Sequence, residues 1–91
     1  MPEFEIEVCI TPRAGILDPE GETIGRALAD LGYAGVRGVR SGRLVRFLLE
    51  APEASAARER VAAMCEELIA NPVIEDYQIE VRPAAEPAEA E

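Results

Sequence analysis

The stretch that decides the fold is Met64–Tyr77, with the sequence MCEELIANPVIEDY, which predicts the end of a helix, a sharp stop and the start of a strand. Val61, Met64 and Leu68 recur at helical spacing, so we expect them to share one buried helix face. The Asn-Pro pair at 71–72 ends the helix, because proline lacks an N–H and disfavours the α conformation in the residue before it. The chain therefore turns back from a helix onto a sheet.

The strand that follows is marked by alternation, since Tyr77, Ile79 and Val81 are separated by polar residues. Residues 3–10 alternate in the same way between apolar and mostly acidic side chains, which predicts a strand with one buried face and one acidic face. A row of glutamates on such a face is most simply a solvated surface and does not predict a metal or acid–base site.

Two helices and two more strands complete the prediction. Asp18 and Pro19 indicate a helix N-cap and first turn, and Gly32 indicates the helix end. Val36–Arg40 is predicted as a short strand that turns at Ser41-Gly42 into a strand over 43–51. The alanine-rich segment 52–70 is predicted as the second helix.

The resulting order is βαββαβ, which predicts an α+β fold of the ferredoxin-like plait type. In that arrangement a four-stranded antiparallel sheet carries both helices on one face. We expect one domain over residues 1–83 and a solvated acidic tail over 84–91, because the tail consists of alanine, glutamate and one proline.

Composition narrows the possible functions. The formal net charge is −9, which disfavours nucleic-acid binding, and the chain has no histidine and two cysteines without a Cys-x-x-Cys pair. We expect Cys65 to be a core thiol and Cys9 to be an unpaired thiol on the outward face of the first strand. No phosphate-binding glycine motif, leader or membrane span is evident, so we expect a cytoplasmic protein with no catalytic residue, no cofactor-binding residue and no metal site.

A cluster of arginines and an apolar strand face both indicate a protein interface. Four arginines and no acid occur between Val36 and Phe47, and the strand 43–51 carries leucines on the face opposite its buried one. Two explanations of the arginines remain open, which are docking to an acidic partner and charge balance across the sheet. The apolar strand face indicates oligomerisation. The interface candidates are Arg37, Arg40, Arg43, Leu44, Arg46 and Leu48, together with Asn71 and Pro72.

Three segments taken together resemble the PurS subunit family of phosphoribosylformylglycinamidine synthase. They are TPRAGILDPEG over 11–21, ALADLGY over 27–33 with residues 36–42 after it, and MCEELIANPVIEDY over 64–77. The resemblance spans roughly residues 3–82. It departs from the family at the start of the second helix, where a Ser-capped, more acidic sequence is usual, and in the longer tail.

The resemblance implies a non-catalytic assembly subunit in de novo purine biosynthesis. Its partners would be a PurQ-type glutaminase and a PurL-type synthetase, and the synthetase would bind the ATP and magnesium. The complex makes formylglycinamidine ribonucleotide from formylglycinamide ribonucleotide, glutamine and ATP, with ammonia passing between the two active sites. The family also implies a homodimer or tetramer with exchanged segments, for which Thr11–Leu17 and Ser41-Gly42 are natural hinges. A free-standing small-molecule sensor domain of the same fold is the alternative.

Overall fold

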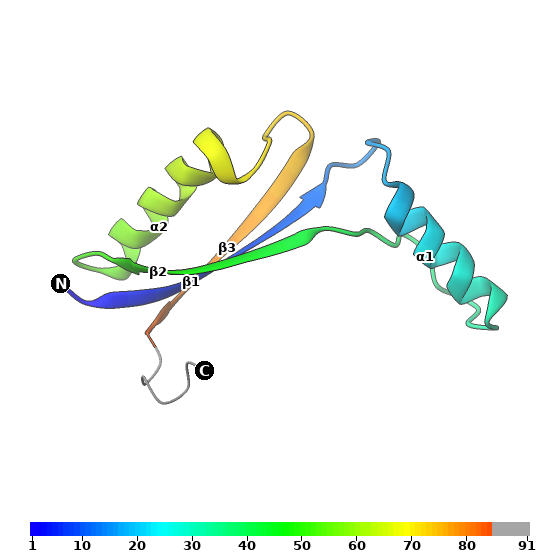
Figure 1. Cartoon of the computed structure of the whole chain (residues 1–91), viewed down its shortest axis with the longest axis horizontal. Coiled ribbons are helices and arrows are strands. Elements are labelled where there is room, and N and C mark those ends of the chain that lie inside the picture. Colours follow the sequence, from blue (N-terminus) through cyan, green and yellow to red (C-terminus); the bar gives the residue numbers. More distant parts are fainter. Residues whose placement is uncertain (85–91) are drawn as a thin grey trace.

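A computed structural model describes residues 1–84 of the 91-residue chain. Its elements are β1 (Glu3–Pro12), α1 (Pro19–Asp30), β2 (Arg43–Glu50), α2 (Ala54–Met64), η1 (Cys65–Ile69) and β3 (Glu75–Pro83). The element η1 is a π-helical turn that continues α2. Figure 1 shows α2 lying over the sheet, while α1 stands apart from the sheet at the far end of the molecule.

The sheet is antiparallel throughout, with the strand order β2-β1-β3. Val8 on the central strand pairs with Val45 on one side and with Ile79 on the other. Because side chains alternate along a strand, this register gathers the apolar residues on one face, which we call the inner face. Those residues are Phe4, Ile6, Val8, Ile10, Val45, Phe47, Leu49, Tyr77, Ile79 and Val81. The opposite, outer face carries charged residues together with Leu44 and Leu48.

The helix over the inner face completes the core with Ala57, Val61 and Cys65, all fully buried. The π turn closes with a hydrogen bond from the Ala70 N–H to the Cys65 carbonyl, 3.1 Å long. This wider turn keeps Ile69 against the core but leaves Leu68 pointing to solvent with 85% of its surface exposed. The prediction that Leu68 shares the buried face is therefore wrong, because it assumed uniform α-helical spacing.

Both predicted ends of α1 are confirmed. The Asp18 carboxylate accepts a hydrogen bond of 3.0 Å from the Gly21 N–H, as an N-cap does. At the other end Gly32 has φ of +97°, and the Tyr33 N–H donates to the Leu28 carbonyl at 3.0 Å. This pattern is a Schellman motif, in which glycine adopts the left-handed conformation at no steric penalty.

The predicted strand Val36–Arg40 is absent, so the sheet has three strands rather than four. Gly35 and Gly38 have φ of +88° and +73°, which an extended strand does not accommodate. Residues 36–39 instead run back along α1, where a Cβ on Gly25 would lie 3.5 Å from Cγ2 of Val39. We call residues 13–42, which comprise α1 with its flanking segments, the arm.

The arm also corrects the expected placement of the helices. Only α2 lies on the inner face, whereas α1 projects beyond the end of the sheet (Figure 1). The α+β class and the antiparallel sheet are confirmed. The last strand ends at Pro83, and the predicted tail lies outside the described residues apart from Ala84. Within residues 1–84, no helix has the length and apolar character needed to cross a membrane.

Candidate protein interface

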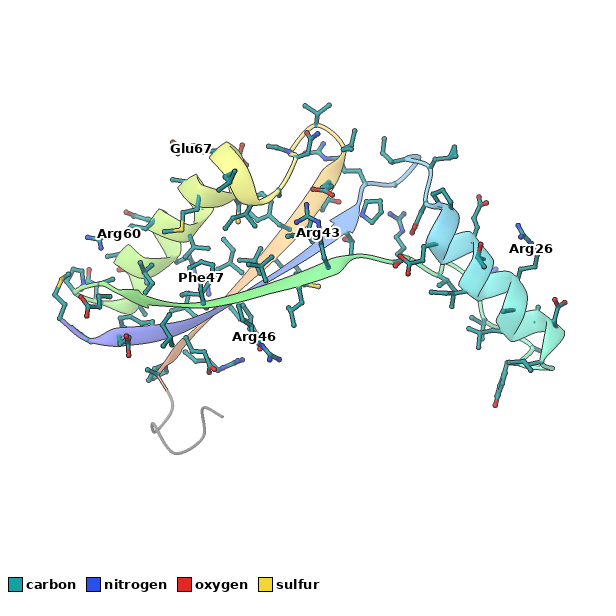
Figure 2. All side chains as sticks on the ribbon, viewed as in Figure 1. Arg26, Arg43, Arg46, Phe47, Arg60 and Glu67 are labelled. Carbon is teal, nitrogen blue, oxygen red and sulfur yellow. The ribbon has the colours of Figure 1, made fainter. Side chains whose placement is uncertain are left out.

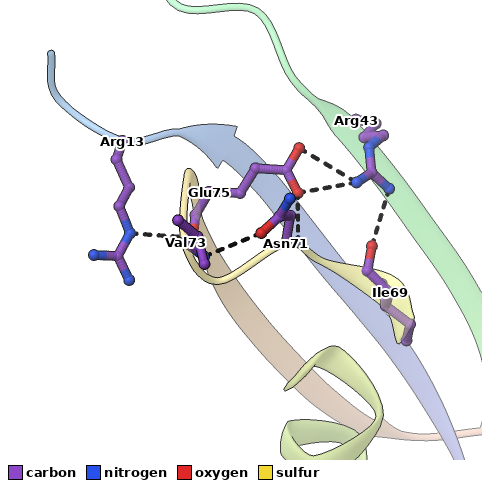
Figure 3. A network of polar contacts seen from close by, with 6 residues as sticks. All are labelled: Arg13, Arg43, Ile69, Asn71, Val73 and Glu75. Carbon is purple, nitrogen blue, oxygen red and sulfur yellow. Dashed lines mark hydrogen bonds and ion pairs between the residues drawn. The ribbon is translucent and has the colours of Figure 1, made fainter. Parts of the chain in front are cut away.

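A polar network fixes the junction between the π turn and β3, as Figure 3 shows. Arg43 of β2 donates one hydrogen bond of 3.1 Å to the Ile69 carbonyl and two, of 3.1 and 3.3 Å, to the Glu75 carboxylate. Glu75 also accepts a hydrogen bond of 2.8 Å from the Asn71 N–H. Because β1 lies between β2 and β3, the Arg43 side chain spans the end of the sheet.

Asn71 shapes the turn itself. Its carbonyl accepts hydrogen bonds from the Ile74 and Glu75 N–H groups at 3.0 and 2.7 Å. Its side-chain oxygen accepts one from the Val73 N–H at 3.1 Å, a local bond typical of asparagine in turns. From the end of β1, the Arg13 N–H donates to the Ile74 carbonyl at 2.9 Å. The turn over 71–75 is therefore held by both neighbouring strands and by its own backbone.

The outer face of the sheet carries a charged ladder between two exposed leucines. Nε of Arg46 lies 2.7 Å from Oε2 of Glu7, and Nη2 of Arg82 lies 3.1 Å from the same oxygen. The hydrogen bonds from Arg46 and then Arg82 hold the pKa of Glu7 below its usual value. Leu44 and Leu48 flank Arg46 on β2 and are 51% and 58% exposed.

The two ends of the arm are joined at its base. The Asp18 carboxylate accepts a hydrogen bond of 2.9 Å from the Ser41 N–H in addition to the one from Gly21. These bonds, the one from Ser41 first, hold the pKa of Asp18 below its usual value. Arg40 donates to the Pro12 carbonyl. These hydrogen bonds, which we call the latch, hold together the segments predicted as hinges. The arm projects from this base.

Much of the apolar surface of the arm is uncovered. Gly21 is the one buried residue of α1. The exposed apolar side chains of the helix and return segment are Ile24, Leu31, Tyr33 and Val36, with exposed fractions of 41%, 73%, 60% and 46%. A surface helix normally buries its apolar stripe against the core. Within the described part of the chain this stripe has no such cover, so it is available for contact with another chain.

The structure does not bring the four candidate arginines together. Arg37 lines a shallow pocket of about 370 Å³ between α1 and its return segment, and Arg40 lies at the base of the arm. Arg43 and Arg46 point to opposite faces of the sheet (Figure 2). The interpretation as one basic hairpin is wrong, because residues 36–42 form no strand and side chains alternate along β2. Charge balance across the sheet is confirmed for Arg46.

The other interface candidates lie in two places. Leu44 and Leu48 are together on the outer face, and Asn71 and Pro72 are in the turn before β3. Sequence reasoning missed the roles of Arg13 and Glu75. For Glu75, the available signal was its position at the start of a strand, four residues after the asparagine that ends the helix.

The inner face offers a second uncovered region, over β2. The helix α2 packs along β3 and not along β2, where Val45, Phe47 and Leu49 are only partly buried, as are the apolar residues of β3. In a complete plait a second helix would lie there, and the chain's own α1 is held away from it (Figure 1). Among residues 1–84, no cluster of three or more histidine, cysteine or acidic side chains could hold a metal ion.

A half-covered plait with a projecting apolar helix defines a class of small α+β proteins whose packing is completed by other chains. Comparison with known proteins identifies the family. The family model described as PurS, phosphoribosylformylglycinamidine (FGAM) synthase, matches residues 5–83. The chain belongs to the PurS family.

Relatives support this assignment over most of the chain. The PurS subunit of Methanocaldococcus jannaschii is 40% identical over 78 residues, which cover 86% of this chain and 94% of that protein. Its crystal structure, described as one of the subunits of formylglycinamide ribonucleotide amidotransferase, superposes with a TM-score of 0.76 at 36% identity, covering 90% and 99% of the two chains. A chain from the structure of PurLQS from Thermotoga maritima gives a TM-score of 0.79 at 36% identity, covering 89% and 99%.

Proposed function

We propose that this chain is the PurS subunit of an FGAM synthase and that it assembles with a PurL-type synthetase and a PurQ-type glutaminase. The observation that carries the proposal is the similarity to a chain of the PurLQS structure from Thermotoga maritima, of which this chain covers 99%. In the proposed complex the glutaminase releases ammonia from glutamine and the synthetase uses ATP and magnesium. This chain bridges the two subunits and supports ammonia transfer without catalysing either step.

We also propose that this chain forms a homodimer by exchange of arms. The apolar stripe of α1, with Ile24 and Leu28, has the character of a core-facing helix surface. The partly buried apolar residues of β2 are where a plait requires its second helix. Since the latch at Asp18 holds α1 away from its own sheet, the α1 of a second copy is the natural occupant. Two such contacts are equivalent, which is the arrangement of a symmetric dimer.

The leucine pair on the outer face supports a further contact between copies. Leu44 and Leu48 lie on the opposite side of the sheet from the position proposed for the exchanged helix. A dimer that exchanges arms on the inner face still exposes this outer strip. Pairing of two dimers through it would give a tetramer, as the family resemblance implies.

Reconstitution tests the assembly function. The purified chain alone should show no glutaminase, ATPase or synthetase activity. Added to the PurL-type and PurQ-type subunits of the same organism, it should restore glutamine-dependent synthesis of formylglycinamidine ribonucleotide. Synthesis with ammonium salt in place of glutamine controls for the synthetase reaction itself. Full glutamine-dependent activity of the other two subunits without this chain would contradict the assembly role.

A further inference from the structure

Three aliphatic side chains at the junction between the π turn and β3 are exposed. We call Leu68, Val73 and Ile74 the tip, and their exposed fractions are 85%, 80% and 39%. The first two are the most exposed large hydrophobic side chains among residues 1–84. Large aliphatic groups that project this far into water are unfavourable in a free subunit, so their exposure calls for a partner.

The tip is rigid as well as exposed. Asn71 holds the backbone of Val73 and Arg43 fixes the carbonyl of Ile69, next to Leu68, as Figure 3 shows. The Arg13 N–H holds the carbonyl of Ile74. The π turn, a feature often found at functional sites, turns Leu68 outward. A surface that is ordered before binding loses little conformational entropy on association. The network therefore presents the tip in a form ready to dock.

The charged residues around the tip are acidic on balance, because Arg13 pairs with Asp76 and Arg43 with Glu75, which leaves Glu66 and Glu67 in excess. Glu66 and Glu67 precede Leu68, and Glu67 projects from the helix end in Figure 2. Asp76, two residues after Ile74, has a side chain that remains 65% exposed although Oδ1 lies 3.4 Å from Nε of Arg13. Glu66 is held in place by a hydrogen bond of 2.7 Å from the Tyr77 hydroxyl. An apolar centre with acidic neighbours matches an apolar socket with a basic rim.

We propose that the tip is the element by which this chain docks into an apolar, basic-rimmed socket on another subunit of the synthase. The inference rests on the proposed function, because it takes the partner to be a different subunit. A second copy is the less suitable occupant, since this chain carries a net charge of −9 and its arm is already engaged in the proposed dimer. The π turn continues α2 on the inner face, whereas Leu44 and Leu48 lie on the outer face, so the contact proposed through these leucines leaves the tip free. The turn before β3 stands apart from the chain's own α1 (Figure 1).

The test measures binding of the full chain to the PurL-type and PurQ-type subunits by isothermal titration calorimetry. The double variant Leu68→Ser with Val73→Ser should bind at least about ten-fold more weakly to one of them, because two central anchors are removed. Its sedimentation mass as a homo-oligomer should equal that of the wild type. Binding of wild-type strength by this variant would overturn the docking proposal, as would loss of the homo-oligomer with binding retained.

A charge variant keeps the proposal testable if the double variant does not fold. Glu67→Arg should weaken the same binding several-fold and reduce its dependence on salt. Glu59→Arg, an exposed glutamate on α2 outside the tip, is the matched control and should leave the affinity unchanged. Equal effects of the two reversals would overturn the docking proposal. A wild-type chain that binds neither subunit would overturn the proposed function, and the docking proposal with it.

Discussion

Asp18 joins two segments of the chain with one carboxylate. It caps α1 through the Gly21 N–H and holds the return segment through the Ser41 N–H. A single acceptor group thus both starts the helix and fixes where the arm ends. Its position before proline made the cap predictable from sequence, whereas the bond to Ser41 depends on the path of residues 31–41 and was not predictable.

Asp18→Ala should loosen the arm in a way that depends on pH. The pKa of Asp18 is lowered in the folded chain, so its stabilising effect is present above the unfolded value, about 3.9, and is lost as pH falls toward the folded value. At pH 7 we expect the α1 amides of the variant to exchange with solvent about ten-fold faster than in the wild type. The difference should shrink below about pH 4.

Glu22→Ala is the control for that experiment, because Glu22 also lies in the first turn of α1 but makes no hydrogen bond to Ser41. It should change exchange little. Equal acceleration in the two variants would show that charge near the helix start, rather than the latch, stabilises the arm.

At the scale of elements, the spacing of apolar residues and the positions of glycine, proline and helix-capping residues predicted β1, α1, β2 and β3 to within about two or three residues. The missing strand shows where that reasoning stops. Residues 36–40 include two β-branched valines, which are typical of a strand, yet Gly38 adopts positive φ and Val39 packs on the glycines of α1. The packing of Val39 against two glycines of the helix is a tertiary contact, and the local sequence pattern does not predict it.

The π turn is the second element that local periodicity does not reveal. One wider turn at Cys65–Ile69 shifts Leu68 from the expected buried face to the surface while Cys65 stays in the core. The sequence predicted the exposure of Leu44 and Leu48 and singled out Asn71 and Pro72 in the turn beside the tip, whereas it did not predict the tip itself or the uncovered α1 stripe. Those surfaces follow from how elements are placed, and sequence pattern alone does not specify that placement.

The two cysteines should report this difference in environment. Cys9 is exposed on the outer face, and Cys65 is fully buried, which raises the pKa of its thiol. With a disulfide reagent under native conditions, Cys9 should react before Cys65, and Cys65 should react only after denaturant is added. Rapid native labelling of Cys65, checked by mass spectrometry of peptides, would contradict its place in the core.

At the scale of the whole molecule, the stability of an oligomer depends on how much apolar surface the copies cover. Each fully buried leucine contributes about 1.5–3 kcal/mol, whereas association itself costs about 4–15 kcal/mol. Burial of Leu44 and Leu48 from two copies would contribute about 6–12 kcal/mol, which falls within the range of the association cost. The exchanged arms add Ile24, Leu31 and Val36 from each copy, which is why we expect them to carry most of the dimer.

Variants on the two surfaces should separate their roles. Ile24→Glu with Leu28→Glu places charge on the α1 stripe and should convert the protein to a monomer in analytical ultracentrifugation. Thr23→Glu, on the same helix beside the stripe, is the control and should keep the wild-type mass. A folded dimer with the charged stripe would place the interface elsewhere.

Leu44→Glu with Leu48→Glu tests the outer face in the same instrument. We expect a lower mass than wild type, either from loss of a tetramer or from dissociation of the dimer. Unchanged mass would show that the outer face is not an interface between copies. Faster labelling of Cys9 in this variant would be independent evidence that the face is covered in the wild type, because Cys9 pairs with Leu44.

The latched base of the arm has a consequence for how quickly copies find one another. Segment exchange usually requires a monomer to open and refold, which makes it slow. Here α1 is already capped at both ends and held outward by Asp18, so two chains can meet as finished parts. Their encounter rate should then lie in the ordinary range for rigid protein docking, about 10⁵–10⁷ M⁻¹ s⁻¹. Newly made chains would dimerise when they collide, and unfolding of the monomer would not limit the rate.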